Sequence, residues 1–321
     1  MVPYPPALAA PGLDAIEGAA ERLTGAIVRT PLIRLSGDDS PAEIWLKLEN
    51  LQPVGSFKVR GAGNAMAELS AERRAAGVYT ASAGNMAQGL AWAARRHGTR
   101  CTAVVPDHAP RTKLAAIEGL GARVEKIPFD DWWHVLETRT HGGTDGHFVH
   151  PVAEPAVIAG NGTIGLEILE DLPDVDAVVV PFGGGGLSTG IAAALRGSGS
   201  EARVLAAEVS TAAPLAAAIA RRQPTPVEYT ASFVDGIGGK TVLPEMWPLV
   251  RELIETSLVV SPRAIAGAVR LLVERHRVVA EGAGAASVAA ALEGDVGGGK
   301  VVCVVSGGNL DRDKLASILT G

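Results

Sequence analysis

The sequence predicts an α/β fold in which helices flank parallel or mixed sheets. Short apolar runs rich in valine alternate with longer alanine-rich stretches of helical period, and this alternation is typical of βα units. Glycines lie at the turns between the two kinds of segment. The length of 321 residues is sufficient for two domains, so we expect two α/β domains that face each other across a cleft.

The apolar runs and the helical stretches can be placed in order along the chain. We expect strands at residues 43–47, 77–80, 101–105, 122–127, 177–181, 203–207 and 300–305. We expect helices at residues 85–96, 110–120, 157–169, 187–196, 262–274 and 284–292. Residues 1–13 contain four prolines and neither lysine nor arginine, so we expect an extended arm there rather than a secretory signal.

The order of these segments predicts where the domains divide. A complete βαβαβ succession lies within residues 46–149, which we assign to a small domain. Residues 150–321 hold a second, longer succession, and we assign them to a large domain together with residues 1–45. Ligands of such sheets bind beyond the carboxyl ends of the strands, so we search for a site in the loops that follow strands.

Composition and charge argue against several classes of protein. The net charge of −6 is spread along the chain without a basic run, so nucleic-acid binding is disfavoured. No apolar stretch approaches the ~20 residues of a membrane helix, and we expect a cytoplasmic protein. Cys101 and Cys303 each lie in an apolar run and neither belongs to a CxxC pair, so we expect two reduced, buried thiols.

The first candidate functional segment is GSFKVRG at residues 55–61, which follows a predicted strand and precedes a helical stretch. Lys58 has an aromatic neighbour, Phe57, able to lie against a planar ring, and the glycines permit close backbone approach. These are the needs of a lysine that forms an imine with a cofactor. Taken alone, Lys58 could also be a solvated lysine in a turn, as most lysines are.

The second candidate is a run of four glycines, Gly183, Gly184, Gly185 and Gly186, followed by Leu187. The run comes after the strand-like AVVVPF and leads into the helix-like STGIAAAL. Successive glycine amides can converge on an anion, and the helix adds the positive end of its dipole. A flexible loop is the alternative, but the strand before and the helix after favour a phosphate site without the ending of a P-loop.

Two further segments are rich in glycine. SGGN at residues 306–309 follows the last predicted strand, and taken alone it is an ordinary turn. GAGAAS at residues 282–287 resembles a dinucleotide fingerprint but lacks its third Gly or Ala, and no acidic residue follows about 20 positions later. We expect close helix packing there rather than NAD binding.

Together with the loop SAGN at residues 82–85, these segments become specific. The chain resembles the threonine and serine dehydratase branch of the tryptophan-synthase-β-like (fold type II) pyridoxal-phosphate enzymes. The resemblance rests on RTPL at 29–32, GSFK at 55–58, SAGN at 82–85, HP at 150–151, GT at 162–163, the four glycines and SGGN at 306–309. These segments come in the family's order and cover almost the whole chain.

The resemblance implies a set of residues that hold pyridoxal 5'-phosphate. Lys58 would bind the cofactor as a Schiff base and, once displaced by substrate, would remove the α-proton. Phe57 would pack near the ring, Asn85 would reach the phenolic oxygen and Ser306 would face the pyridine nitrogen. The backbone amides from Gly183 to Leu187 would hold the phosphate.

The resemblance also implies a substrate site and a reaction. The substrate carboxylate would bind to the loop of Ser82, Ala83, Gly84, Asn85 and Met86. A hydroxyl at Ser306 cannot keep the pyridine nitrogen protonated as an aspartate would, so loss of the β-hydroxyl would be favoured over transamination. The expected reaction converts L-threonine, L-serine or a related β-hydroxy-amino acid to a 2-oxo acid and ammonia, in a protein that forms homodimers as the family usually does.

Two departures from the family's pattern concern the substrate. The family's SAGNHAQG has a histidine where this chain has Met86, and the pair Trp132 and Trp133 is bulkier than we expect there. A dehydratase that prefers a bulkier substrate such as phenylserine is therefore an alternative. Racemases of this branch carry a serine beside the loop glycine, whereas this chain has Ala83, which argues against a serine racemase.

Two further departures concern metal binding and regulation. Racemases and some dehydratases of the branch bind a divalent cation through a glutamate and an aspartate six residues later. Glu208 matches the first position but Pro214 stands at the second, so we expect no metal and give Glu208 a structural role as an equal alternative. The chain ends at Gly321, soon after Ser306, so we expect no C-terminal regulatory domain.

Three other functions are compatible with parts of the sequence. A β-replacement transferase of the cysteine-synthase kind shares the fold, but SFKVRG and SAGN fit dehydratases better. An NAD-dependent oxidoreductase would depend on the incomplete glycine motif at 282–287. A non-catalytic binding protein on the same scaffold would be expected to lose Lys58, which is present.

Overall fold

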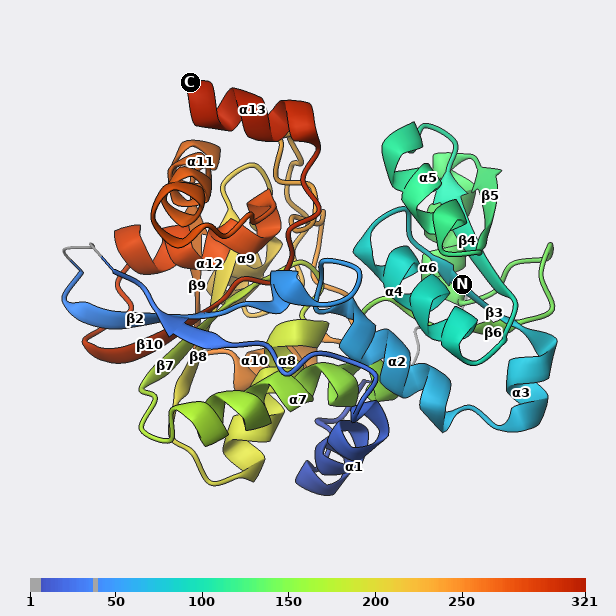
Figure 1. Ribbon diagram of the computed structural model, residues 1–321, viewed down its shortest axis with the longest axis horizontal. Coiled ribbons are helices and arrows are strands. Elements are labelled where there is room, and N and C mark those ends of the chain that lie inside the picture. Colours follow the sequence, from blue (N-terminus) through green and yellow to red (C-terminus); the bar gives the residue numbers. More distant parts are fainter. Residues whose placement is uncertain (1–6, 37–39) are drawn as a thin grey trace.

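Two sheets organise the part of the chain that the structure, a computed structural model, describes, namely residues 7–36 and 40–321 (Figure 1). In this part, six strands form one sheet in the order β1-β2-β10-β7-β8-β9, and four form another in the order β5-β4-β3-β6. Strand β1 is antiparallel to β2, and all other neighbours in both sheets are parallel. The α/β fold with parallel and mixed sheets is confirmed.

The strands are short, as is usual for parallel sheets between helices. The larger sheet contains β1 (Leu32–Arg34), β2 (Ala42–Lys47), β7 (Ala177–Pro181), β8 (Arg203–Val209), β9 (Thr256–Val260) and β10 (Gly299–Val304). The smaller sheet contains β3 (Val78–Ala81), β4 (Cys101–Pro106), β5 (Arg123–Ile127) and β6 (His147–Phe148).

Helices surround both sheets. In the first half of the chain they are α1 (Leu13–Leu23), α2 (Lys58–Glu68), α3 (Ala71–Ala76), α4 (Asn85–Arg96), α5 (Arg111–Gly119), α6 (Phe129–Thr138) and α7 (Pro155–Asp171), with a 3-10 turn at Glu49–Leu51. In the second half they are α8 (Gly186–Gly197), α9 (Pro214–Arg221), α10 (Trp247–Leu253), α11 (Pro262–Leu271), α12 (Gly282–Glu293) and α13 (Arg312–Thr320).

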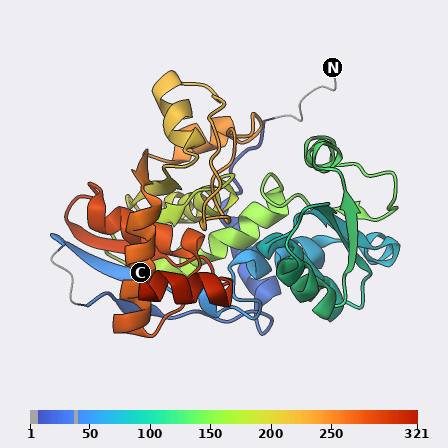
Figure 2. The same cartoon turned by 90° about the horizontal axis from the view of Figure 1, so that it is seen from above.

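Both faces of the larger sheet are buried. Helix α12 packs on one face with α11 beside it, and α8 packs on the other face with α7 behind it (Figures 1 and 2). In β7, Val179 contributes to the core on the α12 side, whereas Val178 and Val180 contribute to the core on the α8 side. This two-sided burial explains why the strand is a continuous apolar run rather than an alternating one.

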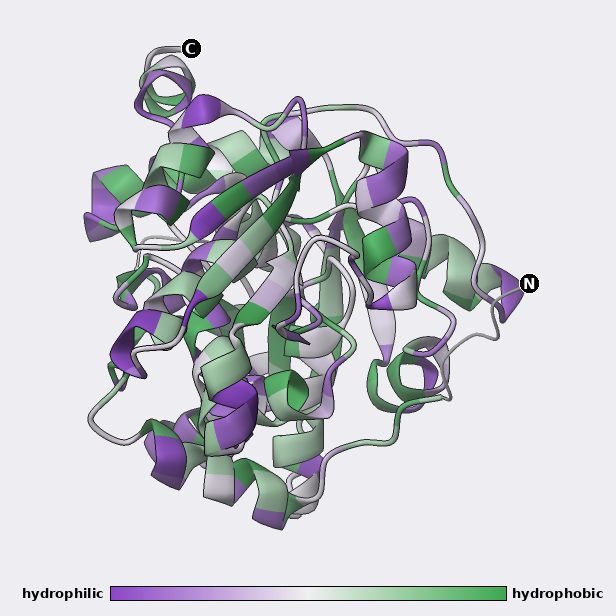
Figure 3. Ribbon diagram, turned by 90° about the vertical axis from the view of Figure 1, so that its right-hand side faces the viewer, coloured by the Kyte–Doolittle hydropathy of each residue, from purple (hydrophilic) through white to green (hydrophobic). Residues whose placement is uncertain are grey.

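Hydropathy follows this layering. Apolar residues gather in the strands and the inner helices, while hydrophilic residues lie on the outer helices and turns (Figure 3). In the described residues, no helix is both apolar and long enough to cross a membrane. Cys101 and Cys303 are both buried, as expected, and no disulfide joins them.

The domain boundaries remain a proposal that the sheet topology supports. Strand β2, in the first part of the chain, pairs with β10, in the last part, so both segments belong to the larger sheet. We therefore propose a large domain of residues 1–45 and 150–321 and a small domain of residues 46–149, although β2 itself runs to Lys47. Helix α2 packs against both α7 and α4 and so joins the two.

The predicted strands and helices all occur, with shifts at their ends. The sequence analysis missed three strands, β1, β6 and β9, and several helices, among them α1 and α6. The arm expected at residues 1–13 overlaps α1 by one residue, Leu13, and residues 7–12 form no helix or strand. Residues 1–6 of the expected arm lie outside the described part. The helix expected at 262–274 ends as a π-helical turn at Leu272–His276.

Candidate active site

All the residues assigned to the cofactor or to the substrate carboxylate line one pocket of about 450 Å³. The pocket lies where loops from both sheets meet. The smaller sheet contributes the loops after β3 and β4, and the larger sheet contributes those after β7 and β10. This is the edge at which ligands of parallel sheets bind.

Lys58 stands at the first position of α2, and backbone hydrogen bonds fix the loop before it. The amide of Phe57 donates to the carbonyl of Ser306 at 3.0 Å, and the amide of Gly308 donates to the carbonyl of Gly55 at 2.9 Å. The Nζ atom of Lys58 donates to the carbonyl of Pro151 at 2.7 Å. It lies 5.0 Å from the centroid of the Phe57 ring.

The environment of Lys58 favours an uncharged amine. Part of the side chain faces the pocket, yet its surroundings are dry enough that burial lowers the pKa of Lys58 to about 8. In the described residues no carboxylate forms an ion pair with it. An amine with a lowered pKa is a better nucleophile at neutral pH, which is the requirement for bonding to a carbonyl carbon.

His150 orders the turn that receives Lys58. Its Nδ1 atom accepts from the amides of Val152 and Ala153, at 3.0 and 2.7 Å. Burial, with Arg139 and Lys58 nearby, lowers the pKa of His150 to about 3, so the ring is neutral and can accept these bonds. The turn therefore presents the Pro151 carbonyl to Lys58.

The four glycines form a cradle at the N-terminus of α8. Gly185 has φ +96°, a conformation that other residues rarely adopt, and a Cβ at Gly186 would lie 2.9 Å from the carbonyl oxygen of Val152. Tight packing on Val152 and Val250 therefore leaves no room for side chains here, and the glycine backbone itself lines the pocket. Free amides at a helix start and the positive end of its dipole suit a phosphate.

Asn85, the first residue of α4, is held by two residues to which the sequence analysis gave no role. Its Nδ2 atom donates to Oε1 of Glu281 at 2.7 Å, and its Oδ1 atom accepts from Nδ2 of Asn309 at 2.8 Å. Because one end of the amide meets an acceptor and the other a donor, its orientation is fixed. Burial raises the pKa of Glu281 to about 7, although the bond from Asn85 lowers it.

The sequence around Glu281 gives only a weak indication that this residue belongs to the site. It is a single acidic residue in the apolar segment VVAEGAG, directly before α12, and it lines the pocket. An ion pair between Lys113 of α5 and Asp235, 2.8 Å long, also lies at the pocket wall. Nothing in the sequence around Lys113 or Asp235 indicates that the two side chains would pair.

A protein-family model described as "Pyridoxal-phosphate dependent enzyme" matches residues 23–307. The chain belongs to this family. Among curated relatives, the L-threonine ammonia-lyase of Thermotoga maritima is 43% identical over 312 residues, covering 96% of this chain and 78% of that protein. Expectation and comparison agree that this is a pyridoxal-phosphate-dependent lyase of fold type II.

Solved structures of the same fold include both lyases and racemases. The structure of maize serine racemase superposes with a TM-score of 0.90 at 31% identity and covers 96% of this chain and 97% of that one. The processed form of threonine deaminase isoform 2 from Solanum lycopersicum has a TM-score of 0.85 at 29% identity, covering 100% and 99%.

The pocket of this pyridoxal-phosphate enzyme fits its cofactor. Gly183 to Gly186 line the pocket with backbone at the start of α8, which suits a phosphate, and the lowered pKa of Lys58 suits covalent attachment of an aldehyde. Ser306 is almost fully buried at the end of β10, on the pocket wall. The groups available to hold the cofactor are thus backbone amides of the glycines, the hydroxyl of Ser306 and the amine of Lys58.

Glu208 does not line this pocket and its carboxylate is already occupied. It accepts from the amides of Leu215 and Ala216, both at 2.8 Å, and from the hydroxyl of Ser257 at 2.6 Å. These contacts cap the start of α9. In residues 7–36 and 40–321, no group of three potential ligands from His, Cys, Asp and Glu is placed to hold a metal ion.

The segment at residues 282–287 is the start of α12. A Cβ on Gly284 would lie 2.3 Å from the carbonyl oxygen of Gly307, so the glycine permits close packing of the helix against the loop after β10. This packing places Glu281 beside Asn85.

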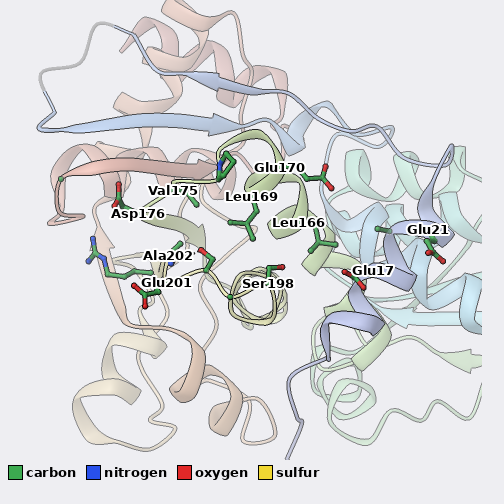
Figure 4. A pocket seen from close by; sticks show the side chains of 16 residues that line it. Glu17, Glu21, Leu166, Leu169, Glu170, Val175, Asp176, Ser198, Glu201 and Ala202 are labelled. Atoms are coloured by element: carbon green, nitrogen blue, oxygen red, sulfur yellow. Dashed lines mark hydrogen bonds between the residues drawn. The ribbon is translucent and has the colours of Figure 1, made fainter.

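A larger cavity of about 1,200 Å³ lies away from the pocket, between α1, α7 and the loop before β8 (Figure 4). Its labelled side chains include Glu17, Glu21, Glu170, Asp176 and Glu201, which are spread around an open recess. It contains none of the glycine, lysine or amide groups described above. Chemistry rather than size therefore identifies the active site.

Proposed function

We propose that this chain is an ammonia-lyase that converts L-threonine, L-serine or a related β-hydroxy-amino acid to a 2-oxo acid and ammonia. The observation that carries the proposal is the convergence of Lys58, the glycine cradle and the loop of residues 82–86 on one pocket. The names of the relatives, threonine ammonia-lyase and threonine deaminase, support this reaction.

Different residues of the chain would hold the cofactor and transfer the proton. When bound, pyridoxal phosphate supplies an electron sink that acidifies the Cα–H bond of an attached amino acid. Lys58 would hold the cofactor, and its neutral amine would then take the Cα proton. The amides of Gly183 to Leu187 would hold the phosphate, while Phe57 would pack against the ring.

The other pocket residues would set orientation and reaction type. Asn85, fixed by Glu281 and Asn309, would direct its remaining amide hydrogen toward the cofactor's phenolic oxygen. Ser306, a neutral hydroxyl, would face the pyridine nitrogen without protonating it, which favours elimination. The carboxylate loop, from Ser82 to Met86, would orient the substrate.

Racemisation is the second candidate, because the fold superposes on maize serine racemase. Ala83 argues against it, since its methyl group cannot deliver a proton to the opposite face of the substrate. Measuring the D-enantiomer formed from L-serine tests this directly. We also propose that the chain forms a homodimer in the cytoplasm, and light scattering of the purified protein tests the oligomeric state.

The direct test is a screen for ammonia and 2-oxo acid release from L-threonine and L-serine. Wild-type protein should release both products in equal amounts, and Lys58→Ala should remain folded and release neither. Lys300→Ala is the matched control, because that lysine lies on the surface and pairs with Asp174. Turnover retained in Lys58→Ala would contradict the role of this lysine.

A further inference from the structure

A row of aromatic side chains forms one wall of the pocket, and none of them belongs to the residues assigned to the cofactor or the carboxylate. His108, Phe129 and Trp132 all line the pocket. Their ring centroids are 5.8 Å apart between His108 and Phe129 and 5.7 Å apart between Phe129 and Trp132. These are the distances at which aromatic rings pack favourably.

The wall is built on fixed elements of the small domain. His108 comes from the loop after β4, and Phe129 and Trp132 lie in the first turn of α6. The indole N–H of Trp132 donates to the carbonyl of Val104 in β4 at 3.1 Å. The indole also packs against a core that includes buried Val135, so the ring is held in place.

The next residue provides a contrast. The ring centroid of Trp133 lies 6.2 Å from that of Trp132, but Trp133 does not line the pocket. Its indole N–H donates to Oε1 of Glu137 on the same helix, at 2.9 Å. Of the two tryptophans that stand out in the sequence, Trp132 lines the pocket and Trp133 does not.

The arrangement of the pocket assigns this wall to the substrate side chain. The cofactor's anchors lie at the start of α2, around the start of α8 and after β10; they are Lys58, Gly183 to Leu187 and Ser306. A substrate joins the cofactor through its amine and meets the loop of residues 82–86 through its carboxylate. Its β-substituent is then left facing the small-domain wall. Met86, the last residue of that loop, is almost fully buried, lines the pocket and adds a further apolar surface.

We propose that Trp132 and Phe129 are specificity-determining residues that favour β-hydroxy-amino acids with an aromatic or large apolar β-substituent. The proposal rests on the proposed function and names its substrate class. A methyl group can contact only part of the wall, whereas an aryl group can pack against two rings and be removed from water. Pockets for ligands of this size are typically about 300–1,000 Å³, a range that includes the 450 Å³ found here.

The reaction balances for this class as it does for threonine. The Cα–H and Cβ–O bonds break, and the proton and the hydroxyl leave as water, which gives an enamine. Cβ then gains a proton while the nitrogen loses one, and water hydrolyses the resulting imine to the 2-oxo acid and ammonia. The net change from substrate to 2-oxo acid plus ammonia needs no oxidant or reductant.

The test compares L-threonine with L-threo-phenylserine in three proteins: wild type, Trp132→Ala and Trp133→Ala. We expect wild-type kcat/KM for phenylserine to equal or exceed that for threonine. Trp132→Ala should lower the phenylserine-to-threonine ratio at least tenfold, and Trp133→Ala should change it less than twofold. A wild type that prefers threonine by a hundredfold would overturn the proposal, as would a Trp132→Ala variant that slows both substrates equally.

Binding of unreactive amino acids gives a readout that does not depend on elimination. L-phenylalanine and L-alanine lack the β-hydroxyl, and their binding to the holoenzyme can be followed from the visible spectrum of the cofactor. We expect phenylalanine to bind at least ten times more tightly than alanine, and Trp132→Phe to retain this preference. Equal affinities for phenylalanine and alanine would contradict the proposal that the aromatic wall determines specificity. A clear preference for phenylalanine without turnover of any hydroxy-amino acid would support the wall and contradict only the proposed function.

Discussion

Replacing Arg60 tests a buried ionic network directly behind the proposed active-site lysine. Arg60 is fully buried two residues after Lys58, and its guanidinium donates to both carboxylate oxygens of Glu49, at 2.7 and 2.8 Å. It also donates to both oxygens of Glu167, at 2.7 and 2.9 Å, and to the hydroxyl of Thr163 at 3.0 Å. The network joins α2 to α7 and to the turn after β2.

The positive and negative charges of this network are balanced, and the expected loss of unfolding free energy comes from upsetting that balance. Burial by itself would raise the pKa of Glu167, but hydrogen bonds and charge from Arg60, together with Lys47, hold it below its usual value. Arg60→Met removes one cation and leaves Glu49, which is 0% exposed, without a charged partner. Breaking one side of a buried pair costs about 3–5 kcal/mol of the free energy of unfolding.

The assay is urea denaturation followed by tryptophan fluorescence and circular dichroism. The matched control is Arg29→Met, because Arg29 also pairs with two carboxylates, those of Glu170 and Asp171, but its side chain is 49% exposed. Exposed pairs contribute about 0–1 kcal/mol. A loss in Arg60→Met no greater than that in Arg29→Met would refute the reasoning.

Three further predictions follow from the site. Gly185→Ala should weaken cofactor binding at least tenfold because of its positive φ, whereas Gly183→Ala, whose Cβ would meet nothing closer than 3.5 Å, should bind normally; equilibrium titration with pyridoxal phosphate separates the two. Burial raises the pKa of Glu281 in the folded protein to about 7, above the 4.5 of the unfolded chain. The protonated carboxyl group therefore contributes its full stabilisation of the fold below about pH 4.5, and this contribution is lost as the pH rises through about 7. Relative to Glu281→Gln, which can still accept from Asn85, wild-type apoprotein should therefore lose roughly 3 kcal/mol of unfolding free energy over that range, and parallel curves would contradict the raised pKa. Apoprotein should take up the cofactor faster as pH rises through about 8, where Lys58 loses its proton, and a rate independent of pH from 7 to 9 would contradict its lowered pKa.

Sequence periodicity predicted the elements that are buried on both sides. The run AVVVP at β7 and the stretch at α4 were placed with the correct bounds or nearly so, because burial makes their composition distinctive. The two-residue β6 and the three-residue β1 are too short to show a pattern. Strand β9 lies at the sheet edge, where three of its five residues are half-buried and one is exposed, so its apolar signal is diluted.

The site was predictable where local sequence carries the chemistry. Lys58, the four glycines and the loop of residues 82–86 each follow a strand, and parallel strands bring such loops together. Glu281 and Asn309 were not predicted to fix Asn85, because that contact joins segments about 200 residues apart. The pair Trp132 and Trp133 stood out by bulk, but which of them faces the pocket depends on the orientation of α6.

The most direct test of the central claim is the identity of the lysine that carries the cofactor. Purified holoenzyme would be reduced with borohydride, digested and analysed by mass spectrometry, with Lys58→Ala treated in parallel. The account predicts that the cofactor's mass lies on the peptide containing Lys58, and that the variant shows neither this mass nor the visible imine absorbance. Cofactor found on another lysine of the wild type, or an imine band retained by Lys58→Ala, would contradict it.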